Sequence, residues 1–495
     1  MLQALKMKGI IMKKSILRLL SLTISIIMIF SCVACGAKVE YESYYEDVPT
    51  GNSDNTSNNT SANTSDDTSV NTSVDSGEIE DNSTTSKPTS SVNEGGPTGK
   101  TNLSVDEFIA AMPSKLRGTT IKMLFWDDLR STAYSSALNE FQKATGIKIE
   151  IEIANKDAYQ TTLASRISSG QSPDVVKCID NNVSSVANLL PITDSGYDFG
   201  DANWDKNLMK MFTFNGKCYA FNVQDSHNKN FGIITYNKKA LKRANMVKDD
   251  PYTIWKNDPS KWTWNKFWSM CDAFVKANNG KEGYYGSTWG TEDMYVNAFG
   301  VALWRYDHNS GKVVNCSNTA ESVKRYGEII KAVNNKWSTT VYDGTGFSSG
   351  KILFNATYSS IAENNSSICL ELKKGDNLGF VPMPVDSTYT PLFETCAYGI
   401  PVGSKNAAAV PYFIRYIFSP ESIKESEFYF NEEARAVVSS VIKKDKLFFG
   451  NGYNYNVWQE MIKGTDANVK SVLDSYQGMI NDNVADANNS ISKLH

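Results

Sequence analysis

The stretch Thr119-Thr-Ile-Lys-Met-Leu-Phe-Trp126-Asp127-Asp128 decides the fold, because its apolar run ends in polar residues and predicts a short buried strand. A helical stripe of apolar side chains follows, formed by Tyr134, Ala137, Leu138 and Phe141. After Gly146, whose position suits a helix end, isoleucines alternate with charged residues from Ile147 to Ile153. Strand, helix and strand in this order predict a βαβ unit in an α/β fold with a mainly parallel sheet.

Three polar or aromatic residues, Trp126, Asp127 and Asp128, end this first predicted strand. In open α/β sheets, ligands bind beyond the carboxyl ends of the strands, so these residues are candidates for a ligand-binding site. A tryptophan offers a flat apolar face to the CH groups of a sugar, and carboxylates accept hydrogen bonds from its hydroxyls. The alternative is structural: Trp126 covers the core, and the two aspartates form a turn and a helix N-cap.

Residues 1–35 have the pattern of a secretory signal. Basic residues precede an apolar run from Leu19 to Phe30, which is too short for a comfortable transmembrane helix. Ala34 then precedes Cys35, and this ending resembles a bacterial lipoprotein signal, in which the cysteine receives a lipid such as palmitate. Cleavage before Cys32, or an ordinary cleaved signal, are the alternatives.

Residues 36–102 consist mainly of Ser, Thr, Asn, Asp and Gly. Such a composition buries too little apolar surface to offset the entropy of ordering, so we predict a disordered tether. From about Leu103 the composition becomes globular and rich in aromatic residues. The remaining chain is longer than one hydrophobic core usually serves, which predicts two lobes.

The charge and motif content argue against several functions. The formal net charge is −4 without a basic patch, which disfavours a nucleic-acid partner. The three histidines have no metal-ligand spacing, and the chain lacks a Gly-rich phosphate loop, so we expect no metal and no cofactor. The cysteines outside the signal form no compact disulfide framework, which leaves both disulfides and buried free thiols open.

A second buried strand is predicted from Val175 to Ile179, and its polar end, Asp180 and Asn181, is expected beside the first candidate site. The alternative for Asp180 and Asn181 is a simple turn. The segment LASRISSGQSPDVV at 163–176 resembles the hallmark of extracellular solute-binding proteins of ABC importers, in the maltodextrin-binding branch.

Further segments resemble the same family in the same order. They include FNGKCYAFN (214–222), IITYNKKALKRANM (233–246), WTWNKFWSMCDAFV (262–275), FSSGKILFNATYSS (347–360) and YGIPVGSKNAAAVPYFIRYIFSPE (398–421). The resemblance covers the chain after Gly118 and implies a two-lobed, periplasmic-binding-protein-like fold with the ligand in a cleft between the lobes. The implied boundaries are 103–235 and 395–445 for lobe one, and 236–394 and 446–495 for lobe two.

The resemblance also implies site residues in lobe two. A predicted strand ends at Trp289, with Glu292 beyond it, and Tyr358 lies where family members present an aromatic ring to a sugar. Trp304 faces either the cleft or the core. Together with the aromatic content of 11%, these residues favour a mono- or oligosaccharide as the ligand of a protein that is not an enzyme.

The implied partners are the permease subunits of an ABC transporter and, through the lipid anchor, the membrane. We expect a monomer on the extracellular face of the cell membrane of a Gram-positive bacterium. Two other classes stay open: a secreted glycoside hydrolase, in which Asp127 faces Glu292 or Asp293, and a wall-tethered carbohydrate-binding adhesin.

Overall fold

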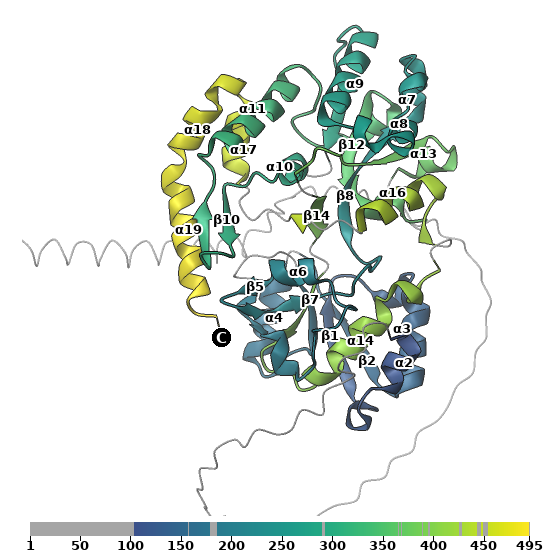
Figure 1. Cartoon of the computed structure of the whole chain (residues 1–495), viewed down its shortest axis with the longest axis vertical. Helices are drawn as coiled ribbons and strands as arrows, with labels where there is room; N and C mark the ends of the chain where they lie inside the picture. The colour runs from purple at the N-terminus through teal and green to yellow at the C-terminus, as the bar shows by residue number, and fades with distance from the viewer. Residues whose placement is uncertain are drawn as a thin grey trace, which may run out of the picture. The chain divides into compact units, whose positions relative to one another are not determined.

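The computed structural model describes residues 103–156, 158–178, 186–289, 293–364, 366–367, 369–388, 390–394, 397–424, 428–442, 447–448 and 454–494. The predicted signal with Cys35, the predicted tether, and the candidate residues Asp180, Asn181 and Glu292 lie outside these ranges. The described chain forms two α/β lobes, each built around one sheet (Figure 1). Within it, no helix is long and apolar enough to cross a membrane.

The sheet of lobe one contains β1 (Thr120–Phe125) next to its edge strand. The strands β2 (Lys148–Ile153) and β3 (Val175–Cys178) lie on either side of β1 and run parallel to it. The helix α3 (Ser135–Thr145) connects β1 to β2, which confirms the predicted βαβ unit. Gly146 ends α3 at a φ of 71°, a conformation that a residue without a side chain adopts at little cost.

The other half of this sheet contradicts the expectation of a mainly parallel arrangement. The strand β15 (Ala397–Pro401) runs antiparallel to β3, and it also pairs antiparallel with β4 (Leu189–Leu190) and β7 (Ala220–Phe221). The reason is topological, because β15 returns from lobe two instead of following a helical crossover within lobe one. The α/β class is confirmed, and the sheet is mixed.

Helices and one hairpin complete lobe one. They are α2 (Val105–Ala110), α4 (Tyr159–Ser168), α6 (Lys206–Met211), α14 (Val410–Ile417) and the hairpin of β5 (Thr213–Phe214) with β6 (Lys217–Cys218). α14 is buried along its length and packs against α2 and α3. Pro411 lies in its first turn, where a missing backbone N–H costs nothing.

The described chain begins on lobe one, where α2 is held at its first turn. Ser104 forms a capping box with Glu107, and the backbone N–H of Val105 donates a hydrogen bond to Glu421 Oε2 at 3.1 Å. The buried Arg415 on α14 donates from Nη2 to Asn203 Oδ1 at 3.0 Å and to the carbonyl of Leu103 at 3.4 Å. These contacts fix the start of the folded chain to α14.

The sheet of lobe two has β8 (Asn230–Asn237) at its centre, between β12 on one side and β13 and β14 on the other. Its other strands are β9 (Tyr285–Trp289), β12 (Ile352–Tyr358), β13 (Leu378–Pro382), β14 (Thr390–Glu394) and β16 (Leu447–Phe448). β12 runs parallel to β9 and antiparallel to β8, so this sheet is mixed too.

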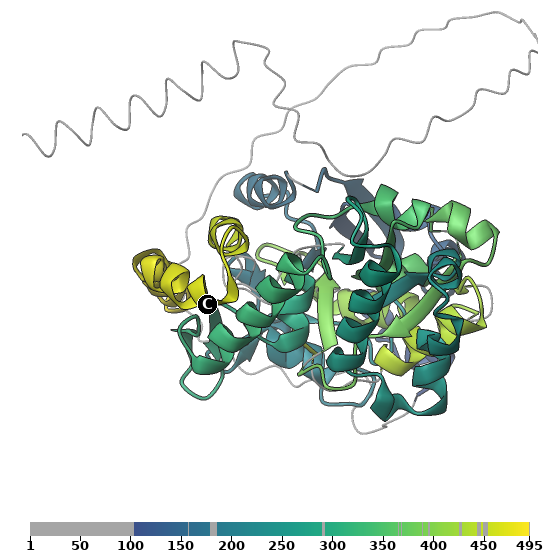
Figure 2. The same ribbon diagram turned by 90° about the horizontal axis from the view of Figure 1, so that it is seen from above.

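The helices of lobe two surround this sheet on both faces. They are α7 (Lys238–Arg243), α8 (Pro251–Asn257), α9 (Trp264–Ala277), α10 (Asp293–Phe299), α11 (Ala320–Asn334), α12 (Gly344–Ser349), α13 (Leu370–Lys374), α16 (Glu432–Ile442), α17 (Tyr455–Ile462), α18 (Val469–Ser475) and α19 (Gln477–Ile491). The aromatic residues Trp264, Phe267 and Phe274 of α9 are buried in the core of this lobe. The helices α17 to α19, yellow in Figure 2, gather at one side of the lobe.

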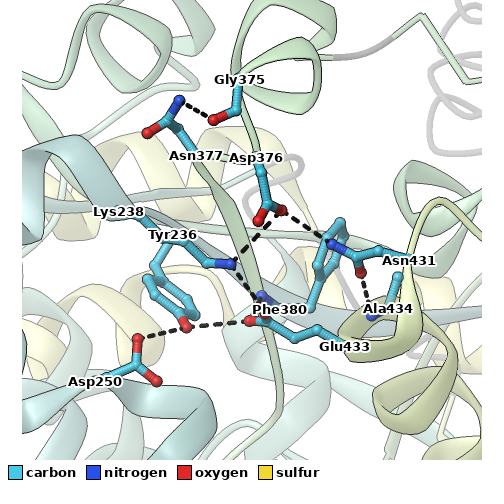
Figure 3. Close-up of polar contacts among 10 residues, drawn as sticks. All are labelled: Tyr236, Lys238, Asp250, Gly375, Asp376, Asn377, Phe380, Asn431, Glu433 and Ala434. Atoms are coloured by element: carbon cyan, nitrogen blue, oxygen red, sulfur yellow. Dashed lines mark hydrogen bonds and ion pairs between the residues drawn. The ribbon is translucent and has the colours of Figure 1, made fainter.

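The position of α16 corrects one expected boundary, because residues 395–445 were assigned to lobe one. α16 packs on β8 and β13 of lobe two, with its apolar face in the same core cluster as Phe231 and Phe380. At its first turn, Glu433 accepts hydrogen bonds from the Phe380 N–H (2.8 Å) and the Tyr236 hydroxyl (3.0 Å) and pairs with Lys238 (2.8 Å) (Figure 3). An amphipathic pattern shows that a helix has a buried face, but it does not show which sheet covers that face.

The two lobes contact each other at the hairpin of β10 (Trp304–Asp307) and β11 (Lys312–Asn315). The Asn215 N–H of lobe one donates a hydrogen bond to the Tyr306 hydroxyl at 3.2 Å, and the rings of Phe214 and Tyr306 are 4.9 Å apart. The Asn215 side-chain amide donates to the Ile491 carbonyl at the end of α19. Lobe two therefore contacts lobe one through this hairpin and its last helix.

Candidate ligand-binding site

Trp126 follows β1 directly and is half-buried. Its ring packs edge-to-face on Tyr159, with centroids 4.9 Å apart and an interplanar angle of 84°. The ammonium of Lys177 lies 4.5 Å from the centroid of the Trp126 ring, and the ammonium of Lys156 lies 5.7 Å from it. Both distances are within the range of a cation–π contact.

The backbone register of the sheet places Lys177 beside Trp126. β1 and β3 pair in parallel with Leu124 opposite Val176, so the residues that follow on each strand approach the same edge. Tyr159 from α4 fixes both strands, because its hydroxyl donates to the Leu124 carbonyl at 2.7 Å and accepts from the Lys177 N–H at 3.0 Å. Burial raises the pKa of the Tyr159 hydroxyl well above its usual value, so it stays a donor.

Asp127 and Lys177 form a loose ion pair, with 3.5 Å between Oδ2 and Nζ. The two side chains differ in exposure: 7% of the lysine is exposed, against 55% of the aspartate. The lysine is therefore held by the protein, whereas the aspartate is free to turn toward water.

Asp128 has the structural role that was the alternative to ligand binding. It caps the short 3₁₀ helix Leu129–Ser131, where its Oδ1 accepts from the Arg130 N–H, and it forms a two-pronged pair with the Arg130 guanidinium. The hydrogen bond from the Arg130 side chain lowers the pKa of the Asp128 carboxyl. Both carboxylate oxygens of Asp128 are thus bound by Arg130 within the same turn.

Glu363 is a residue of lobe two whose carboxyl is affected by charges of both lobes. It follows the short helix Ser359–Ala362 after β12, and burial raises the pKa of its carboxyl to about 7. The charges of Lys373, Asp127 and Lys177 also act on this carboxyl, so Glu363 lies within electrostatic range of both lobe-one residues. Lys373 donates to the backbone carbonyls of Glu363 (2.9 Å) and Ser366 (3.0 Å), and burial lowers its pKa to about 8.

Sequence reasoning missed Lys177, Lys373 and Glu363. The signal for Glu363 was available, because it is the first carboxylate after the buried strand that ends at Tyr358. The sequence did not indicate a site role for Lys177. A single lysine within a short apolar run has the same pattern as a lysine that points from a strand into solvent.

The burial of Trp289 contradicts the prediction that its ring faces a ligand. Only 4% of the residue is exposed, its indole N–H donates to the Ser338 hydroxyl, and its ring packs between Tyr295 and Trp458. The helices α10 and α17 supply these two rings and cover the end of β9. Trp289 is therefore a core residue in this structure.

The other lobe-two candidates are Tyr358, Trp304 and Asp293. Tyr358 ends β12, lies opposite Gly232 of β8, and is half-buried against the core of the lobe. Trp304 begins β10 and packs against the core clusters of both lobes. Asp293 starts α10. In the described residues, no group of three or more His, Cys, Asp or Glu side chains could hold a metal ion.

The described chain thus has a two-lobed α/β fold, in which each lobe has its own sheet and charged and aromatic residues follow the strands of lobe one. Residues 136–427, more than half of the chain, match the family model of bacterial extracellular solute-binding proteins, and the chain belongs to this family. Members of this family bind solutes, and the family is not one of enzymes.

Solved structures share the fold at low sequence identity. An extracellular solute-binding protein from Staphylococcus aureus, solved in complex with maltose, is 14% identical with a TM-score of 0.52, covering 74% of this chain and 98% of that one. M. tuberculosis UspC is also 14% identical, with a TM-score of 0.50, covering 75% of this chain and 100% of that one. No curated protein sequence matches the chain.

Proposed function

We propose that the protein is a lipid-anchored extracellular receptor that captures a carbohydrate and delivers it to an ABC importer. The observation that carries the proposal is the aromatic ring of Trp126 beside the charged groups of Lys177 and Asp127 at the strand ends of lobe one. An aromatic ring beside hydrogen-bonding charged groups is the combination that sugars require. The maltose bound to the S. aureus protein is in keeping with this ligand class.

Delivery and anchoring rest on the sequence and on the family. A secretory pattern that ends at Cys35, or at Cys32, followed by a polar stretch suits a receptor held at the outer face of the membrane. The binding lobes do not transport a solute themselves, so a permease is the partner that the proposal requires.

A ligand screen tests the carbohydrate proposal. We expect one class among neutral and charged mono- and oligosaccharides to raise the melting temperature of the full-length protein, because a ligand that binds only the folded state stabilises it. Titration calorimetry then gives the affinity, and Trp126→Ala is expected to weaken it. If no member of the panel shifts the melting temperature, the carbohydrate proposal fails.

A glycoside hydrolase is the second candidate, favoured by one observation. Glu363 has a pKa of about 7 and lies within electrostatic range of Asp127, and a protonated carboxyl with a nearby carboxylate is the pair that glycosidases use. Incubation with labelled oligosaccharides separates the two functions. We expect the oligosaccharides to be recovered intact, and their cleavage, lost in Glu363→Gln, would establish the hydrolase instead.

A further inference from the structure

We infer that Asp250 and Glu433 share one proton through the Tyr236 hydroxyl, and that α8 and α16 are tied together at this point only while the proton is bound. The Tyr236 hydroxyl lies 2.8 Å from Asp250 Oδ2 and 3.0 Å from Glu433 Oε1 (Figure 3). The inference concerns a pH-sensitive contact within lobe two and does not depend on the ligand of the protein.

The first step is a count of the hydrogen atoms between the three oxygens. A phenol hydroxyl has one hydrogen, and an ionised carboxylate has none. If both carboxyl groups are ionised, Tyr236 donates to one of them, and the other places an oxygen against the phenol oxygen without a hydrogen between them. One added proton turns both short contacts into hydrogen bonds, because one carboxyl then donates to the phenol oxygen while the hydroxyl donates to the other.

The second step is that the phenol cannot move away from either carboxyl. Tyr236 is fully buried on β8 and lies opposite Gly379 of β13, where even a Cβ atom would collide with its ring. On another side the ring packs on Phe354, with centroids 6.4 Å apart. The hydroxyl is therefore a fixed point, and the two carboxyl groups have to adapt to it.

The third step concerns the charges around this hydroxyl. Burial raises the pKa of the Glu433 carboxyl, although the hydrogen bonds from Lys238 and from the Phe380 N–H act in the opposite direction. Burial and the two negative charges raise the pKa of the Tyr236 hydroxyl, so the phenol keeps its hydrogen. The other described charged or titratable groups beside this contact are Asp376, 3.9 Å from the Lys238 ammonium, Tyr252 of α8, and the exposed pair of Glu432 and Arg435 on α16.

The fourth step concerns what the proton connects. Asp250 caps α8, since its Oδ1 accepts from the Thr253 N–H at 2.8 Å, and Glu433 belongs to the first turn of α16. Both helices pack on β13. When the pH rises and the proton leaves, Tyr236 keeps one carboxylate and loses the other. Glu433 is also held by the Phe380 N–H and by Lys238, so we expect Asp250 to turn away and the tie to open.

The substitution Asp250→Asn tests the inference, because an asparagine amide donates to the phenol oxygen at every pH and still caps α8. The full-length wild type and the variant are compared by urea unfolding from about pH 5 to about pH 9. We expect similar stability at the acidic end. As the pH rises, the wild type should lose stability relative to the variant, by about tenfold in the folding equilibrium constant for each unit by which folding raises the apparent pKa of the pair. Glu363 is present in both proteins, so its own titration cancels.

The chain offers a matched control in Asp258→Asn. Asp258 caps the 3₁₀ helix Pro259–Lys261, where its Oδ1 accepts from the Ser260 N–H at 3.2 Å. The hydrogen bonds from Ser260 and Lys261 lower the pKa of this carboxyl, so it stays ionised over the whole range and its difference from the wild type should not change with pH. The same constant difference is expected for Asp250→Asn in a Tyr236→Phe background, because the phenol oxygen is gone.

Two results of these measurements would overturn the inference. One is a difference between the wild type and Asp250→Asn that stays constant with pH, and the other is a pH-dependent difference that persists with Tyr236→Phe. Infrared spectroscopy gives a readout that needs neither unfolding nor the Tyr236 variant. The C=O band of protonated carboxyl groups should be weaker in Asp250→Asn than in the wild type at about pH 6, and equal bands would rule out the shared proton.

Discussion

Lys229 and Asp205 form a buried ion pair between the two lobes. Lys229 lies directly before β8, and its side chain is fully buried, whereas Asp205 caps α6 in lobe one through the Leu208 N–H. The backbone N–H of Asp205 also donates to the carbonyl of Asn222, near the end of lobe one's last strand before the crossing. The pair therefore fixes one passage of the chain between the lobes.

We expect Asp205→Ala to lower the free energy of unfolding by about 3–5 kcal/mol, because it leaves the Lys229 ammonium buried without its charged partner. The double substitution Asp205→Ala with Lys229→Met should recover part of this loss. The control is Asp474→Ala, which breaks an exposed pair with Lys470 and should cost less than about 1 kcal/mol. Urea unfolding measures all three, and an equal cost for Asp205→Ala and Asp474→Ala would contradict the prediction.

Trp126 and Trp289 should respond differently to truncation. Trp126→Ala is expected to weaken ligand binding by about 2 kcal/mol, roughly thirtyfold, as for an aromatic anchor at an interface. Trp289→Ala should instead cost about 3–5 kcal/mol of stability, because it opens a cavity between Tyr295 and Trp458. Calorimetric titration and urea unfolding on both variants check this. Normal binding by folded Trp126→Ala would remove Trp126 from the site.

The raised pKa of Glu363 predicts that the free energy of unfolding depends on pH. Its pKa rises from 4.5 to about 7 on folding, so between these values the folded state holds more of the proton than the unfolded state. The stabilisation is complete below about pH 4.5 and is lost as the pH rises to 7, by up to about 3 kcal/mol. Glu363→Gln should flatten this part of the stability profile, measured by urea unfolding from pH 4.5 to 8. Parallel profiles for the variant and the wild type would show that Glu363 does not titrate in this range.

We predict that the contacts of Glu433 stabilise the packing of α16 on the sheet of lobe two. Glu433→Ala removes the acceptor of the Phe380 N–H and the partner of Lys238, and we expect a loss of more than about 2 kcal/mol. Asp376→Ala is the matched control, since Asp376 is exposed and lies 3.9 Å from the same lysine, and it should cost less than about 1 kcal/mol. Glu433→Gln keeps a neutral acceptor and should fall between them. Equal melting temperatures for all three variants would contradict this account.

Cys35→Ser should move the protein from the membrane fraction to the medium or cytosol, because the proposed lipid is attached to this thiol. Cell fractionation followed by immunoblotting measures the shift. Cys32→Ser is the control and should stay with the membrane. If both variants remain bound as the wild type does, the lipoprotein prediction is wrong, and if only Cys32→Ser is released, the lipid is on Cys32.

Local patterns predicted local structure well. The strand before Trp126, the helix that Gly146 ends and the alternating isoleucines lie where periodicity placed them, because these signals depend on neighbours within a few residues. The boundary of lobe one was partly wrong, because α16 has a buried face for which the sequence does not name the opposing sheet. Trp289 was misplaced for the same reason, since Trp458, which covers it, comes far later in the chain.

The strand-end rule named Trp126 and Asp127, whose contact with a ligand stays a prediction. It could not show that Asp128 is held by Arg130 or that Lys177 lies on the Trp126 ring. Both facts depend on side-chain directions that the order of residues does not fix. Glu363 was within reach of the same rule and was overlooked beside Tyr358.

The contacts of Leu103 with Arg415, and of Val105 with Glu421, determine where a mechanical load enters the folded protein. A pull on the chain before residue 103 passes into α2 and α14 of lobe one, without crossing the passages between the lobes. Under the proposed anchoring, a load on the attachment would therefore be carried by lobe one and not by the segments that connect the lobes.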